Sequence, residues 1–492
     1  MNELEEDRPD LKSEFNRLKS VEEKRGKILT NGPYPGIGQS HPDLYKAFSW
    51  RFWNLVSDSG FVGVVLPRSC FVGPGMEQFR RGVLDEGLIK DLTFVKNKAG
   101  WVFEGVEHRY TIALFAFSRS SSIADKEVPL RGPFPDAESY ERALETDPPT
   151  FPAEKAKGWA GSATIPLLPA YPGAEEVFNQ LESHPRLDLD EPGEWRARPL
   201  QEFNATTDKK MDDETQVMHF TDDPPDGYWP VFKGESFGIW NPDTGTRYAW
   251  VDPDVAIDYA QEKRENSYRY AGSRSPYYEM DEDWVHDKDT LPCFSPRIAF
   301  RDVARNTDTR TMISALVPPK LFLTHKAPTL IWPRGHEGDE AYLLGVLSSI
   351  PLDWYARRFV ELTMSFGIFN SFPIPRPNPD ATLRQRVIQL SGRLAAIDDR
   401  YADWADTVGV DYGPLDEDTR QEKIYELDAV VAHLYGLSRD HVEVIFETFH
   451  DGWDYEERLE RVLDYYADWA DRLDLDHADH EAERAAGTRN DD

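Results

Sequence analysis

The sequence predicts an α/β protein in which part of a doubly wound sheet is followed by a mixed α/β domain and a helical C-terminal region. Three observations lead to this fold class. A helix, a short apolar run and a second helix follow one another over residues 43–85. Short strand-like pieces then alternate with turn residues over 196–378. From Ala381 onward, apolar residues recur at helical spacing.

The first strongly patterned element is a helix predicted from Asp43 to Val56. Its apolar residues share one face, which we expect to be the buried face: Leu44, Ala47, Phe48, Phe52 and Leu55. After a turn, the chain continues as the apolar run Phe61–Leu66, which Pro67 ends. A short run without polar interruptions predicts a strand that is buried on both faces, as in a parallel sheet.

A second helix and two more strands complete this predicted domain. The helix is expected around Met76–Asp85, and the strands over Ile89–Val95 and Tyr110–Phe117, with a turn-rich loop between them. This order is typical of the second half of a doubly wound α/β domain. The residues before it show no pattern that would supply the first half.

Changes in composition divide the chain into six regions. Short strands are expected near 228–232, 298–300 and 321–324, and helices over 383–397 and 424–433. The regions are a charged N-terminal helix and turn (1–40), a partial α/β domain (41–120), an irregular acidic connector (121–195), a mixed α/β domain (196–378), a helical region (379–470) and an acidic tail (471–492).

The composition limits the classes of function that are open to the chain. No apolar run approaches the roughly 20 residues needed to cross a bilayer. The acidic N-terminus is unlike a signal peptide, so we expect a cytoplasmic protein without a membrane anchor. Cys70 and Cys293 are the only cysteines, and two distant cysteines form neither a disulfide framework nor a zinc cluster. We therefore predict no metal site.

The net charge of −33 argues by itself against nucleic acid, because phosphate contacts need Lys and Arg. However, the acidic residues are spread along the whole chain. This distribution is typical of a protein from a high-salt cytoplasm, in which carboxylates keep the surface hydrated. We therefore interpret the charge as a sign of a halophilic habitat and look for binding in local patches. An acidic mesophilic protein is the alternative.

One local patch is basic. Residues 291–335 contain seven Lys or Arg and only Asp302 and Asp308 as acids, a local balance of +5. The planar fork of arginine can bond guanine O6 and N7 or clamp a phosphate. The alternative is that these side chains pair with carboxylates elsewhere in the chain. The predicted DNA-binding residues are Arg297, Arg301, Arg305, Arg310, Lys320, Lys326 and Arg334.

Several blocks of the sequence resemble amino-methylating DNA methyltransferases, and most of all the large fused enzymes of type IIG restriction systems and their phage-exclusion relatives. Residues 41–69, HPDLYKAFSWRFWNLVSDSGFVGVVLPRS, are similar to the stretch that follows the family's catalytic loop. Residues 79–117 resemble its closing helix and antiparallel hairpin. The later blocks resemble its target-recognition and tail regions and occur in the same order: 230–242, 295–319, 342–359, 371–377 and 426–449.

The resemblance implies an S-adenosylmethionine-dependent, site-specific methyltransferase that acts on adenine N6 in double-stranded DNA, in a restriction–modification or phage-defence system. Residues 41–120 would be the second half of its Rossmann-like methyltransferase sheet, and 196–378 its target-recognition domain. The family's cofactor-binding strand–turn–helix and its Asn/Asp-Pro-Pro-Tyr/Phe loop normally precede the region that starts here. We therefore assign no cofactor-binding residue and expect a separate polypeptide to supply that half.

Two places could still handle the target base. In the turn Asn31-Gly-Pro33-Tyr34, glycine stands where the family's catalytic loop has its first proline, and no apolar strand leads into it. Asn31, Pro33 and Tyr34 are thus candidates for a degenerate loop, and a plain turn is the favoured interpretation. Phe103 matches the family's aromatic that packs against the flipped adenine. The alternative is that Trp101 and Phe103 are hairpin core.

The leading hypothesis is therefore a DNA-binding C-terminal part of a methyltransferase that needs another polypeptide for catalysis. Two alternatives stay open. The chain could be a DNA-binding specificity subunit or an inactive truncated remnant, without methyltransferase activity of its own. It could also be an unrelated acidic structural protein in which the order of the blocks is a coincidence.

Overall fold

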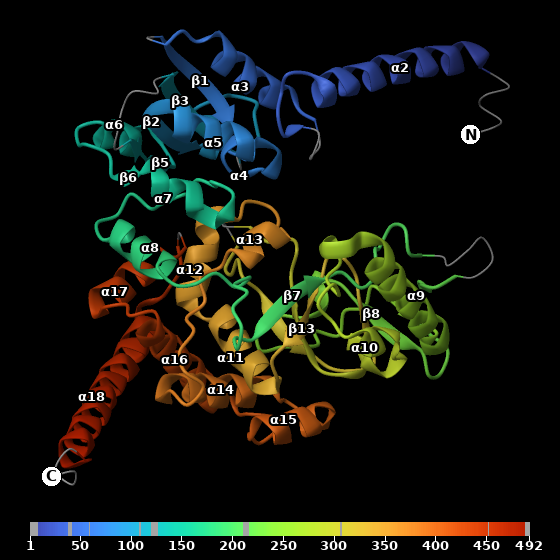
Figure 1. The fold of residues 1–492 in the computed structure, drawn as a ribbon, viewed down its shortest axis with the longest axis vertical. Helices are drawn as coiled ribbons and strands as arrows, with labels where there is room; N and C mark the ends of the chain where they lie inside the picture. The colour runs from blue at the N-terminus through green and yellow to red at the C-terminus, as the bar shows by residue number, and fades with distance from the viewer. Residues whose placement is uncertain are drawn as a thin grey trace. The chain divides into compact units, whose positions relative to one another are not determined.

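A computed structural model describes residues 8–37, 42–58, 60–107, 110–119, 126–209, 216–305, 308–450 and 452–487. The chain divides into two compact units, Met1–Ala170 and Tyr171–Asp492, whose elements are labelled in Figure 1. The boundary between the units falls inside the region that was expected to be an irregular connector. Each unit is described by itself below.

The first unit is built on a four-stranded sheet with the strand order β1-β3-β2-β5. Strands β1 (Phe61–Pro67) and β2 (Gly87–Lys96) both run antiparallel to β3 (Thr111–Arg119), and β5 (Arg131–Phe134) runs parallel to β2. The remaining elements are α2 (Pro9–Asn31), α3 (Leu44–Leu55), α4 (Ser69–Val72), α5 (Glu77–Glu86), β4 (Glu127–Pro129), α6 (Ala137–Ala143), β6 (Thr150–Pro152) and α7 (Ala153–Gly158).

The predicted elements of this unit are confirmed, but the predicted sheet is not. The sequence-based helices and strands correspond to α2, α3, β1, α5, β2 and β3. Strand β1, however, pairs antiparallel with β3 and lies at the border of the sheet, with exposed and half-buried residues alternating along it. The apolar run shows that the strand is hydrophobic. Whether other elements cover its two faces depends on segments that are distant in the sequence. The described residues form a mixed α/β unit and do not confirm a doubly wound half.

Helix α3 buries a different face from the predicted one. The side chain of Asp43 caps its N-terminus by accepting a hydrogen bond from the Tyr45 amide. Trp50 and Trp53 point inward, and Trp50 packs edge-to-face on Phe79 with ring centroids 5.5 Å apart. Two buried indoles remove more apolar area from water than the leucines of the other face could. Of the predicted inward residues, Ala47 is buried, whereas Leu44, Phe48 and Leu55 are exposed.

Residues 121–195 are not irregular where the structure describes them, which corrects the expectation of a connector. They contain β4, β5, α6, β6, α7 and α8 (Ala174–Glu182). These elements are only three to nine residues long. Such short pieces, interrupted by prolines, leave no periodic pattern in the sequence, which is why they were missed.

The described residues of the second unit form two sheets. The larger has the strand order β11-β10-β13-β7, and the smaller has the order β12-β8-β9. The three strand-like pieces predicted in this region correspond to β8, β10 and β12. The bounds of the strands are β7 (Arg196–Leu200), β8 (Trp229–Phe232), β9 (Ala249–Val251), β10 (Arg297–Phe300), β11 (Ser314–Val317), β12 (Phe322–Leu323) and β13 (Thr329–Arg334).

Helices cover the larger sheet, and they begin before residue 379, where the helical region was predicted to start. Helices α11 (Glu337–Ser348) and α12 (Ile350–Phe359) are buried almost throughout, and α11 contacts β10, β11 and α14. The sheet and the helices therefore share one core. The other helices are α9 (Pro253–Ala271), α10 (Glu282–His286), α13 (Phe366–Asn370), α14 (Thr382–Ala395), α15 (Ala402–Val408), α16 (Glu417–Leu434), α17 (Arg439–Glu447) and α18 (Glu456–Gly487).

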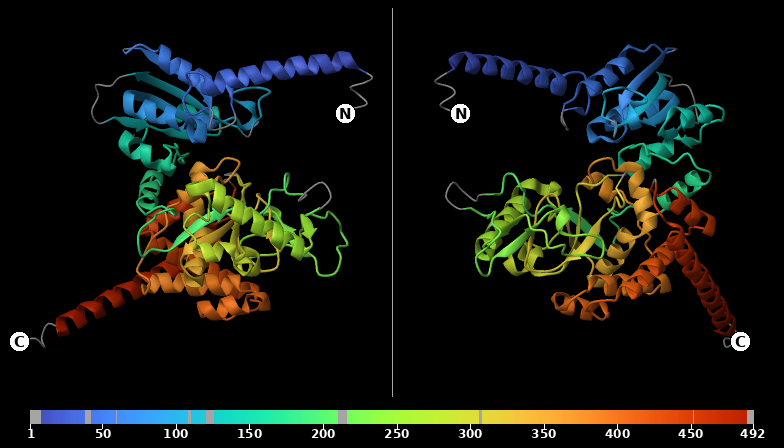
Figure 2. Two further views of the ribbon diagram at one scale, coloured as in Figure 1. Left: turned by 45° about the vertical axis from the view of Figure 1, so that its right-hand side comes forward. Right: turned by 180° about the vertical axis from the view of Figure 1, so that it is seen from behind.

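The arrangement of the second unit separates its small sheet from its C-terminal helices. Helices α9 and α10 lie with β8 at one end of the unit, and α16, α17 and α18 lie at the other end (Figure 1). Helix α18 extends away from the rest of the unit in both views of Figure 2. The region between these ends holds β7, β13 and α11 (Figure 1).

Candidate nucleic-acid interface

The segment at residues 31–34, which partly matches the family's catalytic loop, is a turn at the end of a helix. Asn31 is the last residue of α2, and Pro33 and Tyr34 lie in the turn that follows. The indole of Trp50 donates a hydrogen bond to the carbonyl of Pro35, 3.1 Å away, which ties the turn to α3. Within residues 8–37, no strand leads into these residues. These residues form a turn after α2, and a role for them as a degenerate catalytic loop stays a prediction.

The loop between β2 and β3 is organised by one buried amide. Asn97 is fully buried, and its Oδ1 accepts hydrogen bonds from the amides of Val102 (3.2 Å) and Phe103 (2.9 Å). Its Nδ2 donates to the carbonyls of Phe103 and Val106, both at 3.1 Å. Because one side chain holds both arms of the loop, the backbone around Phe103 has a defined conformation.

The two aromatics of this loop have different environments. Trp101 is half-buried, donates from Nε1 to the carbonyl of Lys96 at 2.6 Å and packs near Tyr140. Phe103 is 42% exposed, although its backbone is held by Asn97. Trp101 is therefore part of the hairpin core, as the alternative interpretation has it. Phe103 is too exposed to be a core residue. A flat aromatic face on a held loop can accept a stacked base, and its contact with DNA stays a prediction.

Arg297 lies inside the second unit, which corrects its assignment as a DNA-binding residue. Only 3% of it is exposed, and it donates to both carboxylate oxygens of Glu202, at 2.9 and 3.1 Å. It also donates to the carbonyl of Leu321 at 3.0 Å. Burial raises the pKa of Glu202, and the guanidinium opposes that shift. A guanidinium held in this way crosslinks the sheet and is not available to a phosphate.

Arg310 is likewise held by an internal carboxylate. Asp353 on α12 is fully buried, forms an ion pair with Arg310 and accepts hydrogen bonds from the amides of Thr311 (3.0 Å) and Met312 (3.3 Å). The Nε of Arg357, one turn further along α12, lies 3.3 Å from the same carboxylate. Its Nη2 donates to the carbonyls of residues 308 and 309. This network holds the base of the predicted DNA-contacting loop.

The remaining five basic residues differ in how they are paired. Arg334 forms an ion pair with Asp190 at 2.5 Å, and Lys326 with Asp302 at 2.7 Å. Arg301 donates from Nε to the carbonyl of residue 237 at 3.2 Å, and burial lowers its pKa. Two of the seven basic side chains make neither a hydrogen bond nor an ion pair within the described part of the chain: Arg305 and Lys320.

The local balance of +5 thus does not form one continuous basic surface. Glu202, Asp353 and Asp190 come from outside the window of residues 291–335 and neutralise three of its arginines. Three of the side chains pair with distant carboxylates, as the alternative interpretation has it: Arg297, Arg310 and Arg334. Lys326 pairs with a carboxylate inside the window. Arg334 and Lys326 remain partly exposed in their ion pairs. Contact with DNA therefore stays a prediction for five members of the set: Arg301, Arg305, Lys320, Lys326 and Arg334.

Strand β1 and helix α3 present a second kind of surface, which we name the α3–β1 surface. Among the described residues β1 pairs on one side only, so that its outer edge offers free backbone donors and acceptors. Large apolar side chains on the same two elements are between 50% and 69% exposed: Leu44, Phe48, Leu55, Phe61 and Val65. An open strand edge with exposed apolar neighbours is the kind of surface to which another strand adds.

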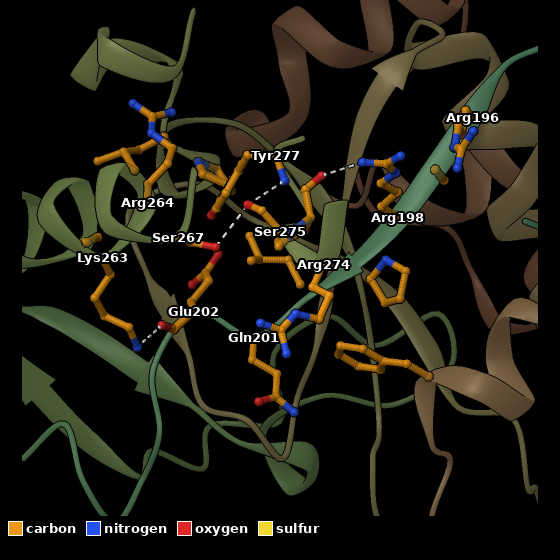
Figure 3. A pocket seen from close by; sticks show the side chains of 18 of the residues that line it. Arg196, Arg198, Gln201, Glu202, Lys263, Arg264, Ser267, Arg274, Ser275 and Tyr277 are labelled. Carbon is orange, nitrogen blue, oxygen red and sulfur yellow. Dashed lines mark hydrogen bonds between the residues drawn. The ribbon is translucent and has the colours of Figure 1, made fainter. Parts of the chain in front are cut away.

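The second unit also contains a cavity of about 760 Å³ that the sequence did not indicate. Its walls are the free edge of β7, one face of α9, the turn at residues 273–277 and helix α13 (Figure 3). These segments are far apart in the chain, so no local motif could have pointed to them. In the described parts of both units, no group of His, Cys, Asp and Glu side chains could hold a metal ion. None of the helices described is long and apolar enough for a bilayer.

No protein-family model matches the chain, and no curated protein matches it in sequence. Similar solved structures include the type IIL restriction-modification enzyme MmeI in complex with DNA, at 12% identity and a TM-score of 0.40, over 82% of this chain and 51% of MmeI. The type IIG restriction endonuclease BpuSI is 12% identical, with a TM-score of 0.29, over 85% of this chain and 52% of its own. A DrdV–DNA complex is 11% identical, with a TM-score of 0.27, over 78% of this chain and 41% of the DrdV chain.

The chain therefore spans about half the length of MmeI and BpuSI. At identities of 11–12% and TM-scores of 0.40 or less, we draw no conclusion about fold or activity from these likenesses.

Proposed function

We propose that this chain is the DNA-binding C-terminal part of a site-specific adenine-N6 DNA methyltransferase of a restriction–modification or phage-defence system. A separate polypeptide would supply the half that binds S-adenosylmethionine. The observation that carries the proposal is the α3–β1 surface, because a sheet with a free apolar edge is completed by another strand. The collinear blocks between residues 41 and 449 that resemble this family support the identity of the missing half.

In the part of the first unit that the structure describes, the turns after the sheet strands do not fit the cofactor. Among the described residues, two turns of the first unit's sheet lead from a strand into an α-helix, at residue 68 after β1 and at residues 135–136 after β5. Neither turn contains glycine, whereas a nucleotide-like cofactor needs a close backbone approach there. We therefore derive no methyl-transfer step from this chain, and the chemistry belongs to the proposed partner.

The role proposed for this chain is to bind DNA and to position the target base. Phe103 would stack on the extruded adenine, an interaction worth roughly 1–3 kcal/mol per base. Asn97 would act as a positioning residue, because it holds the backbone of Phe103 from both sides. Arg301 and Arg305 are the proposed contacts to the DNA backbone or bases, and Arg297 is excluded from that role by its burial.

The first experiment asks whether the α3–β1 surface binds the missing half. The chain is co-expressed with a polypeptide that carries the family's cofactor motif and catalytic loop, and the association constant is measured. Leu55→Asp should weaken association by roughly tenfold or more, because it places a charge in an apolar contact. Leu144→Asp is the matched control, since Leu144 is also exposed but lies at the end of α6. Equal association of the two variants would contradict the proposed surface.

The second experiment tests the activity itself. The associated halves are incubated with DNA and S-adenosylmethionine that carries a labelled methyl group, and labelled N6-methyladenine is measured. Phe103→Ala should reduce methyl transfer without changing association, and Phe103→Trp should retain it because a flat face is kept. If two folded and associated halves transfer no methyl group, the methyltransferase proposal fails, and a specificity subunit or a truncated remnant takes its place.

DNA recognition is tested separately, at one salt concentration for all variants, because screening weakens phosphate contacts. Arg301→Ala and Arg305→Ala should each lower the affinity for DNA. Arg439→Ala is the control, because Arg439 is an exposed arginine on α17 outside the proposed interface. Unchanged affinity in both variants would remove these two residues from the interface.

A further inference from the structure

The cavity of the second unit goes beyond the function proposed above, and its charges point to an anionic ligand. Five basic side chains line it, against two acidic ones. Each acid already has a basic partner outside the lining: Glu202 pairs with Arg297 at 2.9 Å and Asp188 with Arg186 at 2.8 Å. The cavity is therefore positive in a chain whose net charge is −33. Its volume of about 760 Å³ lies in the range of small-molecule sites.

Three of the five basic residues are also neutralised. Arg196 and Arg198 both lie near Glu279, at 3.4 and 2.6 Å, and Lys263 pairs with Asp208. The other two have no carboxylate within ion-pair distance among the residues that the structure describes: Arg264 and Arg274.

Arg264 is a buried charge without an anionic partner. It is 1% exposed, and burial lowers its pKa. Its donors are used by neutral acceptors, namely the side chains of Gln261 and Thr290 and the carbonyl of Asp287. These hydrogen bonds satisfy the N–H groups without a carboxylate in ion-pair distance. The positive charge is compensated only in part, by the face of Trp284, 4.9 Å from the guanidinium carbon, and by the attraction of Asp287 and Glu265. An anion in the adjoining cavity would be attracted to it strongly, because the surroundings screen the interaction less than bulk water does.

Arg274 offers the donors that Arg264 lacks. It is exposed, and Figure 3 shows its guanidinium in the middle of the cavity with Gln201 beside it. Within the described chain, neither side chain makes a hydrogen bond or an ion pair. The same holds for the hydroxyl of Tyr277, a residue that is only 6% exposed. Three separate donors are therefore left for an acceptor-rich ligand.

The cavity also contains one unused acceptor. The Oδ1 of Asn370 is buried and has no hydrogen-bond partner, which is unfavourable unless a ligand supplies a donor. Apolar walls lie nearby in the lining, among them Leu200, Pro276 and Phe366. An inorganic anion would satisfy the donors but would leave the acceptor and the apolar walls unused. A ligand with an anionic group, an N–H donor and a flat apolar part satisfies all of them.

We propose that this cavity binds a nucleotide, with its phosphate paired to Arg274 in the field of Arg264. Gln201 and Tyr277 would donate further hydrogen bonds, and an N–H group of the base would satisfy Asn370. The same chemistry could come from a free mononucleotide or from one nucleotide of a DNA strand. The cavity is assigned from its own donors and charges, and it does not depend on methyltransferase activity.

The test uses the full chain and two probes. Binding of the four deoxynucleoside 5′-monophosphates is measured by calorimetry, with the nucleosides and inorganic phosphate as comparisons. Binding of a short single-stranded oligonucleotide is measured by fluorescence anisotropy. Arg274→Gln removes the charge at an exposed side chain that makes no hydrogen bond or ion pair to a described residue, so the variant should fold as the parent does. Arg269→Gln is the matched control, because Arg269 is exposed on α9 and does not line the cavity.

Saturable binding of a monophosphate that Arg274→Gln weakens by roughly tenfold or more, with Arg269→Gln unchanged, would support a free nucleotide as the ligand. If only the oligonucleotide binds, with the same dependence on Arg274, the ligand is a nucleotide of a DNA strand. The proposal is overturned if neither probe binds, if both variants behave alike, or if inorganic phosphate binds as tightly as the monophosphates. Because no methyl transfer is measured, this result is independent of the partner half.

Discussion

Helix α3 of the first unit and helix α11 of the second are both rich in apolar residues, yet they differ in how far their side chains are buried. In α11, every residue from Gly338 to Ser348 is buried, since the helix contacts β10, β11, α12, α14 and α15. In α3, Trp50 and Trp53 are buried, while Leu55 is 67% exposed. The comparison teaches that an apolar side chain is buried only where other segments cover it, and α3 is covered on one side.

The polar residues of the two units differ in the same way. The second unit encloses complete ionic networks, such as Asp353 with Arg310 and Arg357. The first unit has fewer enclosed charges, and its buried Asn97 serves a surface loop. A buried charge needs partners inside its own unit, whereas a group at an open surface can use solvent or another chain. The following predictions test this difference, from the largest expected effect to the smallest.

The largest effect is expected at Asp353. Asp353→Ala leaves the guanidiniums of Arg310 and Arg357 without their buried carboxylate, which should lower the free energy of unfolding by about 3–5 kcal/mol. Urea denaturation followed by tryptophan fluorescence measures the loss. Asp406→Ala, at an exposed position of α15, should stay within about 0.5 kcal/mol of the parent. Similar losses in the two variants would show that the network does not stabilise the second unit.

A direct pair of leucines compares the two helices. Leu347→Ala in α11 creates a cavity in a closed core and should cost about 2–5 kcal/mol of unfolding free energy. Leu55→Ala in α3 removes an exposed side chain and should change the unfolding free energy by less than about 0.5 kcal/mol. Both are measured by denaturant unfolding of the chain without a partner. A loss at Leu55 as large as that at Leu347 would mean that α3 is covered in solution.

A smaller loss is expected from Asn97→Ala. The change leaves the amides of Val102 and Phe103 without their acceptor and should cost about 1–3 kcal/mol. Amide hydrogen exchange should show faster exchange in residues 97–106 and little change in β3. Asn54→Ala, at an exposed position of α3, is the control. If exchange in the loop is unaltered, the Asn97 amide does not hold Phe103.

The two cysteines report on the units separately, because Cys70 lies in the first and Cys293 in the second. Burial raises the pKa of each thiol to about 12. Both should therefore stay protonated and unreactive toward a thiol reagent at pH 9, where an ordinary cysteine is largely thiolate. With increasing urea, labelling of Cys70 should precede that of Cys293, as followed by mass spectrometry. The reverse order would contradict the view that the first unit is the more open one.

The sequence predicted much of the secondary structure but little of the site. Helices α3, α5 and α14 and strands β2 and β10 follow from local periodicity and turn residues. The pairing of Arg297 with Glu202 joins residues 95 positions apart, and no window of the sequence contains both. The sequence therefore suggested a basic surface where the fold forms internal ion pairs. Arg274 and Asn370 line one cavity but are also far apart in the sequence, so no window of the sequence predicts that they lie together.

What the sequence by itself determined is the set of local elements, the turn at residues 31–34 and the aromatic loop at Phe103. These depend on spacing and capping between near neighbours, which a short window contains. Only the tertiary structure decided which face of α3 is buried, that β1 has a free edge, which arginines are consumed by distant carboxylates and where a positive cavity forms. Each of these depends on contacts between remote segments, whose free energy no local pattern records.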